Sequence, residues 1–499
     1  MSARITRRGV LALDVGTSSV RAAVYDAAGR MLPQTYSAIA YRVDTREPGQ
    51  VSSDPEMLFR LVGRVIDQAL AAGRHRGVEV RGVAMSCYWH SLLGLDGLRR
   101  PTTEVLTWAD TRSTSYENDL RAEADEHAYH ERTGCFFHAS FWPAKLRWLQ
   151  KERPGITRET KTWASFAELC ALRWFGEHRV SISMASGTGL FDPHTCDWDA
   201  AALSLAGVDA GHLSPVHEWD EALSGLRPNF ARRWPALARV PWYLALGDGG
   251  LSNIGAGCVK ADRACAMVGT SAALRIVKEA ADLDIPLGAF AYRLDRRRWV
   301  IGGALSEGGN AMQWIADAFG FRSPALMEAA IRKLPPENHG LTVLPFWAGE
   351  RSPNWRGDAR AAITGMSLST SPAQIARATM EAISYQLGHV FEAMTQATSR
   401  PRLLVASGGW LRHSAVWMQM LSDVLGVAVR RSPEAEASAR GAALLALAAL
   451  GLRPGIWWEK QAAGQTFHPR RTAHTAFQQG RERQAELYRL LFPAPGERG

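Results

Sequence analysis

Three short segments of the chain carry side chains suited to the transfer of a phosphoryl group. In the first, Asp14 ends one apolar run, and a polar turn of Gly16, Thr17 and Ser18 precedes a second run. This pattern predicts a strand, a tight turn and another strand. A carboxylate there can bind Mg2+ directly or through water, the turn offers donors to phosphate oxygens, and Arg21 is a candidate counter-charge. Alone, the segment is equally well explained as a plain β-hairpin, because such turns are common.

A second turn of the same composition, made of Gly269, Thr270 and Ser271, follows about half a chain later and again joins two apolar runs. The repeated pattern indicates an internal structural duplication. Two such turns that face one another can hold a polyphosphate from both sides, and phosphoryl transfer depends mainly on positioning and charge neutralisation. The chain has no Gly-Lys dipeptide, so a Walker A loop is absent.

The third segment places Asp248 between Gly247 and Gly249, just before a predicted helix. A carboxylate there can accept the proton of an attacking hydroxyl as a general base, and the glycines would let a substrate approach the backbone. The same residue is also explained as the N-cap of that helix, a position that favours Asp. Gly408 and Gly409 follow another predicted strand. They would allow a flat or charged ligand to lie close to the backbone, but an ordinary turn between a strand and a helix explains them as well.

Loops of the first half contain four side chains with the properties needed to bind a polyol, namely His90, Trp108, Asp110 and Arg112. A sugar needs several hydrogen-bonding groups and an aromatic face. A satisfied core histidine, a core tryptophan and a surface Asp–Arg pair explain these residues equally well when each is taken alone.

The elements around these segments alternate between strands and helices, which predicts an α/β fold. Helices are expected over 55–72, 143–151, 373–396, 415–425, 437–450 and 481–491, and further strands at 78–85 and 403–406. A stretch rich in tryptophan and proline precedes the predicted domain boundary, which gives domains of 1–243 and 244–499.

Composition and charge exclude several other classes of protein. The 499 residues are 46% hydrophobic and 21% charged, which is ordinary for a globular chain and argues against disorder. The net charge of +9 is spread thinly, without the basic tract of a nucleic-acid-binding protein. No apolar run suits an export signal or a membrane span. The six cysteines include no CxxC pair, so we expect reduced thiols in a cytoplasmic protein.

Over about residues 10–450, the chain resembles the FGGY family of carbohydrate kinases, within the superfamily of actin and hexokinase. The matching segments are 361–366 (AAITGM), 374–375 (QI), 378–381 (ATME), 349–355 (GERSPNW) and 145–149 (KLRWL). The resemblance implies two actin-like, ribonuclease H-like ATPase domains with the active site in the cleft between them. It also implies ATP and Mg2+ as cofactors, and transfer of the γ-phosphate to a hydroxyl of a small sugar or sugar acid.

The same resemblance implies a role for each residue singled out above. Asp14 would serve the metal, and the two Gly-Thr-Ser turns would bind the phosphates. Asp248 would be the general base and would contact the substrate. Gly408 and Gly409 would lie under the nucleoside, and the four loop side chains of the first half would contact the sugar.

The substrate is predicted from two loops. Segments 107–113 (TWADTRS) and 89–92 (WHSL) are most similar to the gluconate kinases of the family, so we expect gluconate to be converted to 6-phosphogluconate. Arg112 and Lys145 are candidates for the cation that a sugar-acid carboxylate needs. A ketopentose kinase such as xylulose kinase is the alternative, and a sugar-independent actin-like or chaperone-like ATPase a remote one. We expect no nucleic-acid or membrane partner; a homodimer stays an open alternative for the assembly.

Overall fold

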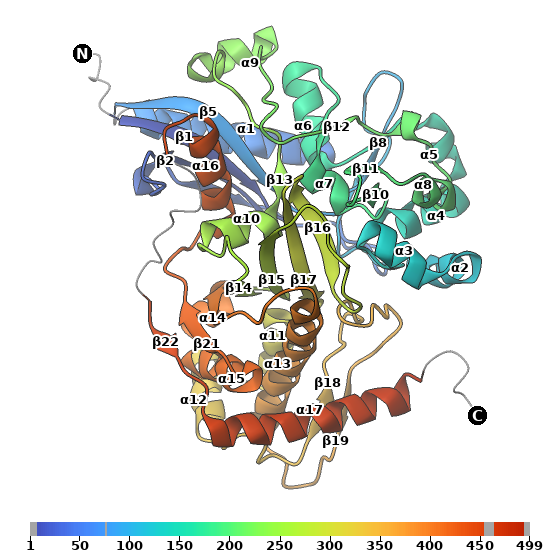
Figure 1. Cartoon of the computed structure of the whole chain (residues 1–499), viewed down its shortest axis with the longest axis vertical. Helices are drawn as coiled ribbons and strands as arrows, with labels where there is room; N and C mark the ends of the chain where they lie inside the picture. The colour runs from blue at the N-terminus through green and yellow to red at the C-terminus, as the bar shows by residue number, and fades with distance from the viewer. Residues whose placement is uncertain (1–6, 75–76, 454–463, 494–499) are drawn as a thin grey trace.

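Two lobes, each built on a mixed β-sheet, make up the molecule (Figure 1). The computed structural model describes residues 7–74, 77–453 and 464–493. Within these residues no helix combines the length and the apolar character needed to cross a membrane. Strands and helices alternate along both lobes, which confirms the predicted α/β class.

The first sheet contains, in order across it, β13 (Leu246–Gly247), β5 (Val78–Cys87), β1 (Arg7–Val15), β2 (Ser19–Asp26) and β3 (Ser37–Ala40). β1 pairs antiparallel with β2 and parallel with β5, which pairs parallel with β13. Residues 9–15 of β1 are all buried, because the strand is central and covered on both faces. The predicted strand–turn–strand unit at the start of the chain is confirmed.

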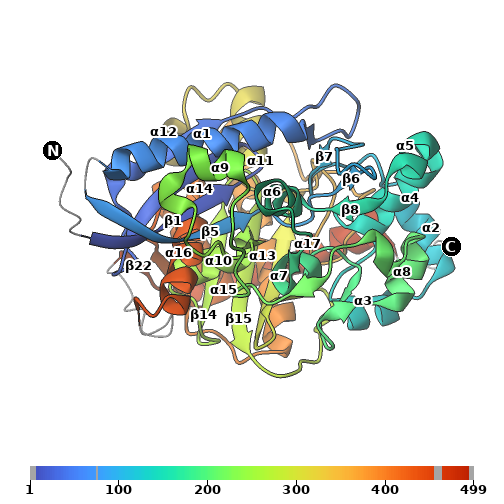
Figure 2. The same cartoon turned by 90° about the horizontal axis from the view of Figure 1, so that it is seen from above.

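Helices α1 (Pro55–Arg74) and α16 (Ala437–Ala449) cover opposite faces of this sheet, as Figure 2 shows from above. α16 comes from the far end of the chain, yet it lies on β1, where Ala439 and Ala12 belong to one buried hydrophobic cluster. The first lobe therefore needs a helix from the second half of the sequence to complete its core.

α16 also lies directly against α10 (Asp248–Gly255). A Cβ added at Gly441 would come within 2.0 Å of the Leu251 carbonyl oxygen, so only glycine allows the two helices to approach this closely. This contact fixes the helix that begins at the predicted general base.

The second sheet contains, in order, β16 (Phe290–Asp295), β17 (Arg298–Leu305), β15 (Ala272–Glu279), β14 (Arg263–Val268), β20 (Leu403–Ser407), β21 (Ala428–Arg431) and β22 (Thr466–Phe467). β14 pairs antiparallel with β15 and parallel with β20. This is the arrangement of β1 with β2 and β5 in the first lobe, and it agrees with the duplication inferred from the two turns.

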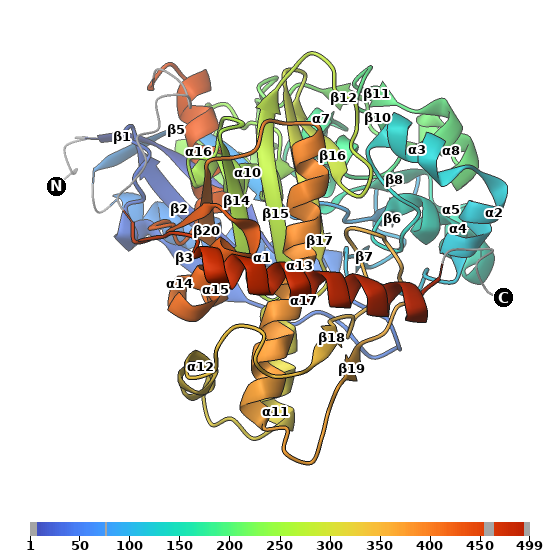
Figure 3. The same cartoon turned by 60° about the horizontal axis from the view of Figure 1, so that its bottom comes forward.

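The long helix α13 (Pro372–Gln396) is the core helix of the second lobe, and most of its residues are buried. Its first turn is closed by a capping box between Ser371 and Gln374. α17 (Arg471–Leu491) crosses it (Figure 3). α17 begins at Arg471 rather than near residue 481, and its first turns escaped prediction because they carry few apolar side chains.

The other helices of the second lobe are α11 (Gly309–Ala318), α12 (Pro324–Arg332), α14 (Gly409–His413) and α15 (Ala415–Leu425). Between β5 and β13 the first lobe carries a large extension with helices α2 (Tyr116–Glu123), α3 (Glu126–Thr133), α4 (Trp142–Glu152), α5 (Pro154–Glu159), α6 (Phe166–Phe175), α7 (Ile182–Ser186), α8 (Ala200–Ala206) and α9 (Pro228–Arg233). The short strand β7 (Val105–Leu106) of this extension pairs with β4 (Ser52–Ser53), which brings the 107–113 loop beside the segment before β4.

Candidate active site

Both Gly-Thr-Ser turns reach one cavity of about 1050 Å³ between the two lobes. Thr17 and Ser18 line it from the first lobe, and Thr270 lines it from the second. In each turn the glycine amide donates to a serine carbonyl of the same turn, at 3.0 Å in the first and 2.9 Å in the second. The remaining turn residues, Gly16, Gly269 and Ser271, lie in these closed turns. The structure therefore brings the two predicted phosphate loops together.

The second turn is held in place by the start of α11. Gly309 N donates to Gly269 O at 2.8 Å, and Asn310 N donates to Thr270 O at 3.0 Å. Asn310 also lines the cavity. A Cβ at Gly309 would lie 1.8 Å from Trp410 Nε1 and 2.6 Å from the Gly269 carbonyl oxygen, so this position requires glycine.

Gly408 and Gly409 lie at the end of β20, beside the second turn. Gly408 has φ of +87°, and a Cβ there would come within 2.4 Å of the Val268 carbonyl oxygen, one residue before the turn. A Cβ at Gly409 would meet nothing within 4 Å. Gly408 is therefore required by the backbone, while Gly409 faces open space; their predicted contact with a nucleoside stays a prediction.

Asp14 and Asp248 come together because Asp14 lies at the end of β1 and Asp248 follows β13, and both strands pair parallel with β5, one on either side. Asp14 is in register with Ser86 of β5, and Leu246, two residues before Asp248, is in register with Ser86 from the other side. Parallel strands end at the same edge of a sheet, which is where α/β proteins bind ligands.

The electrostatics of Asp14 reflect this crowding. Burial raises its pKa to about 6 against the opposing charge of Arg21, and the charges of Asp248 and Glu436 raise it further. Arg21 Nη1 lies 3.0 Å from Asp14 Oδ2 and 3.4 Å from Glu436 Oε2, so this guanidinium is shared between two carboxylates. Carboxylates outnumber cations around Asp14, and the Asp14 carboxylate is the kind of hard ligand that Mg2+ binds.

Asp248 is the first residue of α10, and the N-cap position belongs to Gly247. The alternative that Asp248 is the N-cap is therefore wrong. Its Oδ1 accepts a hydrogen bond from Gly249 N at 2.7 Å. Burial raises the pKa of Asp248, and the positive charges of Arg275 and Arg351 oppose that rise. A raised pKa makes the carboxylate a better proton acceptor than an exposed Asp.

The glycines beside Asp248 make room for a tryptophan. A Cβ at Gly247 would lie 1.9 Å from the Trp89 ring, and one at Gly249 would lie 2.6 Å from it. The Trp89 indole donates to Ser183 O at 2.8 Å. These glycines thus have a packing reason that differs from the substrate approach predicted for them.

Of the four predicted sugar-binding side chains, Trp108 lines the cavity in the described part of the chain, whereas His90 does not. His90 is buried, and its Nδ1 is hydrogen-bonded to Gly187 O. Burial holds the pKa of His90 well below its usual range, and the charge of Arg351 lowers it further. The ring is therefore neutral.

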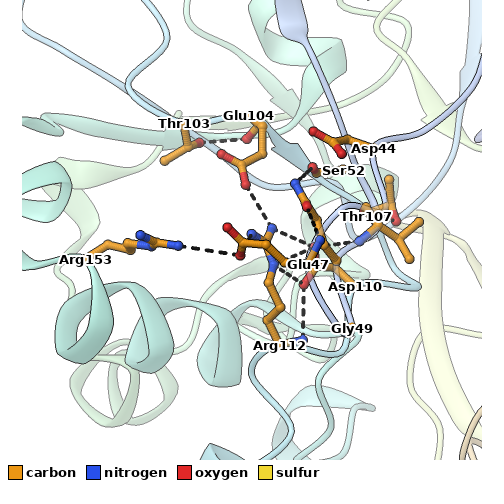
Figure 4. A network of polar contacts seen from close by, with 12 residues as sticks. Asp44, Glu47, Gly49, Ser52, Thr103, Glu104, Thr107, Asp110, Arg112 and Arg153 are labelled. Atoms are coloured by element: carbon orange, nitrogen blue, oxygen red, sulfur yellow. Dashed lines mark hydrogen bonds and ion pairs between the residues drawn. The ribbon is translucent and has the colours of Figure 1, made fainter.

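Asp110 and Arg112 form an internal ion pair, with Arg112 Nη2 2.8 Å from Asp110 Oδ2 (Figure 4). Their side chains are 2% and 6% exposed, and neither is among the described residues that line the cavity. Their predicted contact with a sugar stays a prediction.

Sequence reasoning missed Arg351, which lines the cavity beside Trp108. Its guanidinium lies 4.9 Å from the Trp108 ring and 5.6 Å from the Trp355 ring. The side chain is buried; Nε has no hydrogen-bond partner, and the described residues include no acidic group in an ion pair with it. Burial lowers the pKa of Arg351 to about 10. The Gly-Glu-Arg-x-Pro-x-Trp pattern was the signal that could have found it.

More basic groups surround Arg351. Burial lowers the pKa of Lys145 to about 7; the charge of Asp110 opposes this, and that of Arg351 adds to it. Burial and the charge of Arg351 likewise lower the pKa of His138, which lines the cavity. The Lys145 ammonium donates to the Ala139 carbonyl oxygen. Three basic side chains, Arg351, Lys145 and His138, are therefore gathered on this side of the cleft.

The chain matches known proteins over nearly its whole length. The N-terminal domain model of the FGGY family of carbohydrate kinases matches residues 9–255, and the C-terminal domain model matches residues 264–450. The chain is 28% identical to the gluconokinase of Bacillus subtilis (strain 168), over 97% of this chain and 94% of the relative. It is 31% identical to the glycerol kinase of Rhodospirillum centenum, over 89% of this chain and 90% of the relative.

Among solved structures, the gluconate kinase and the ligand-bound xylulose kinase of Lactobacillus acidophilus each superpose with a TM-score of 0.90. Each is 23% identical to this chain and covers 99% of it and 100% of its own length. At this identity the likeness shows a shared fold.

Proposed function

Because the chain belongs to the FGGY family of carbohydrate kinases and is thus a phosphotransferase with a hydroxyl acceptor, we propose that it phosphorylates gluconate to 6-phosphogluconate. The family uses ATP as the phosphate donor. Its relatives are named for gluconate, glycerol and xylulose, so the acceptor is chosen here from the chemistry of the cleft.

The observation that carries the choice of a sugar acid is the unpaired guanidinium of Arg351 in the cavity wall. A buried charge without a partner is costly, and a ligand carboxylate would supply both the counter-charge and hydrogen-bond acceptors. Lys145 adds to the positive potential. Arg112, the other cation considered for this task, is already engaged with acidic side chains.

In the proposed reaction Asp248 takes the proton of the acceptor hydroxyl as its oxygen attacks the γ-phosphorus in line, and the bond from that phosphorus to the leaving ADP oxygen breaks. The two turns at Thr17 and Thr270 would donate hydrogen bonds to the phosphate oxygens. Closure of the lobes would exclude water, the competing nucleophile.

Mg2+ fits the carboxylates at the strand ends. Asp14 would hold it, with Asp248 and Glu436 adding negative charge nearby. When bound, the ion would offset charge on the β- and γ-phosphate oxygens.

A screen of ADP release with gluconate, xylulose, ribulose and glycerol tests the acceptor. We expect gluconate to have the highest kcat/KM, by about 10-fold or more. A neutral acceptor would leave the Arg351 guanidinium without a partner, and a site discriminates strongly against a ligand that leaves its buried polar groups unpaired. If a ketopentose is active and gluconate inert, the substrate is wrong and the kinase class stands. ADP release that needs no sugar would favour the remote ATPase alternative. The homodimer, the cytoplasmic location and the domain limits of 1–243 and 244–499 stay predictions.

A further inference from the structure

Segment 43–51 forms a wall of the cleft, although it contains no helix or strand of its own. Val43 and residues 45–51 line the cavity on the side of the first lobe, while Thr270, Asn310 and Arg351 line it from the second lobe. One bridge joins Asp44 to Ser52, and one turn is closed by the Gln50 amide, which donates to Glu47 O at 3.0 Å. Neither contact ties residues 45–51 to the rest of the first lobe, so the position of this wall depends on contacts with other parts of the chain.

The 107–111 loop supplies those contacts. Thr111 N donates to Gly49 O at 2.8 Å, and Thr107 Oγ1 donates to Val51 O at 2.7 Å. Asp110 Oδ2 accepts from Val51 N at 3.0 Å. The carboxylate of Asp110 is thus a tether for the inner end of the wall.

Arg112 holds that tether. Its Nε donates to Asp110 Oδ1 at 3.1 Å, and its Nη2 donates to Asp110 Oδ2 at 2.8 Å, which is the fork geometry that fixes a carboxylate. Nη2 also reaches Glu104 Oε1 at 2.9 Å, and the guanidinium lies 4.6 Å from the Trp148 ring. Arg112 is therefore locked on two sides and cannot swing freely toward the cleft.

The middle of the wall is tied to the same group. Glu47 Oε2 lies 3.6 Å from Arg112 Nη1 and 3.6 Å from Arg153 Nη2. Figure 4 shows Arg112 at the centre of these contacts, between Glu47, Glu104 and Asp110. One buried guanidinium thus reaches the middle of the wall directly and its Val51 end through Asp110.

We propose that Arg112 is a positioning residue that holds the 43–51 wall in place, so that the acceptor is bound and water is kept from the γ-phosphate. The consequence for catalysis rests on the proposed kinase function, whereas the tether itself is a matter of geometry. In this role Arg112 acts on the sugar through Asp110 and the wall, without touching it.

Two variants loosen the wall in different ways. Arg112→Gln removes the charge and the fork. Gly49→Ala leaves the ion pairs intact, but its Cβ would meet Thr111 Oγ1 at 2.8 Å in a backbone with φ of +77°. Gly225→Ala is the matched control, because Gly225 has φ of +75° with nothing within 4 Å and lies outside the cleft.

Both wall variants are expected to raise KM for the acceptor by about 10-fold or more, because a loosened wall binds the acceptor more weakly. KM for ATP should change less. They should also release more ADP than sugar phosphate, because water reaches the γ-phosphate. Gly225→Ala should keep the wild-type KM values and a ratio of ADP to sugar phosphate near that of the wild type. If both wall variants keep the wild-type ratio of ADP to sugar phosphate and the wild-type KM for the acceptor, the proposal is overturned.

Amide hydrogen exchange tests the tether without any activity. The Val51 and Thr111 amides should exchange at least about 10-fold faster in Arg112→Gln than in the wild type, because local opening of a tethered loop sets the rate. If Arg112→Gln does not fold, Arg112→Lys keeps the charge without the fork and should move both readouts in the same direction. A wild type inert toward every sugar would refute the kinase substrate alone; unchanged exchange at both amides would refute the tether.

Discussion

Replacing Asp248 with Asn removes the proposed proton acceptor and leaves the shape of the site intact. The Asn Oδ1 can still accept the hydrogen bond that Gly249 N donates to Asp248 at 2.7 Å. The fold should tolerate the change, because burial raises the pKa of Asp248. A carboxyl whose pKa is raised by folding is destabilising when ionised at neutral pH, so the neutral Asn is expected to leave Tm unchanged or slightly higher.

The loss in rate follows from the chemistry that Asn cannot perform. General-base catalysis contributes about 10²- to 10⁴-fold, which is about 2.7 to 5.4 kcal/mol of barrier at 1.36 kcal/mol per tenfold. We therefore expect kcat to fall at least about 100-fold. Nothing in the two phosphate turns changes, so affinity for ATP should stay within about 2-fold, or roughly 0.4 kcal/mol.

The assay is steady-state ADP release coupled to a second enzyme, with ATP binding measured separately by calorimetry. Ser252→Ala is the local control, because the Ser252 hydroxyl donates to the Asp248 carbonyl oxygen at 2.8 Å in the same helix, and its loss disturbs α10 without removing the carboxylate. Its kcat should stay within about 3-fold of the wild type, the low end of what one hydrogen bond contributes. An Asp248→Asn enzyme with near-full kcat would remove Asp248 from the mechanism.

Four further predictions concern the rest of the cleft. In the wild type, kcat/KM should fall on the acidic side at a pH above 3.8, the ordinary pKa of an Asp. The pKa of Asp248 is raised, so this base is protonated and inactivated at a higher pH than an ordinary Asp, and a pH–rate profile checks this. Arg351→Gln should lower kcat/KM for gluconate by about 10-fold or more, the measured scale for hydrogen bonds to charged groups, and spare a neutral polyol. As pH rises through about 7, Lys145 loses its charge, so KM for gluconate should rise in the wild type and not in Lys145→Met. Asp14→Asn should raise the Mg2+ concentration needed for half-maximal rate by about 10-fold or more, since Mg2+ depends on hard carboxylates; a Mg2+ titration at fixed ATP measures this.

Much of the fold could be predicted because its signals are local. The strand–turn–strand units around residues 10–25 and 264–277 follow from apolar runs broken by Gly-Thr-Ser turns. The helix at 415–425 was predicted with the bounds that it has, because a capping serine and a closing glycine mark its ends. The start of α17 was missed because few of the buried positions of this helix carry apolar side chains.

The candidate site divides in the same way. The two phosphate turns and Asp248 could be chosen from the sequence, because chemistry in a short turn depends on neighbouring residue types. That the two turns meet at one cavity, and that Asp14 and Asp248 lie on either side of β5, depends on strand pairing between distant segments. No local pattern encodes the parallel register that aligns those strand ends.

The sequence by itself determined which side chains are available: two hydroxyl-lined turns, a carboxylate at the start of a helix, and many arginines, among which it pointed to Arg112 and not to Arg351. Only the tertiary structure decided which way the two arginines point. Arg112 is turned inward onto Asp110 and Trp148, and Arg351 faces the cleft without an acidic partner. The reason is physical: a guanidinium goes where distant carboxylates and aromatic rings are brought by folding, and those partners lie far away in the sequence.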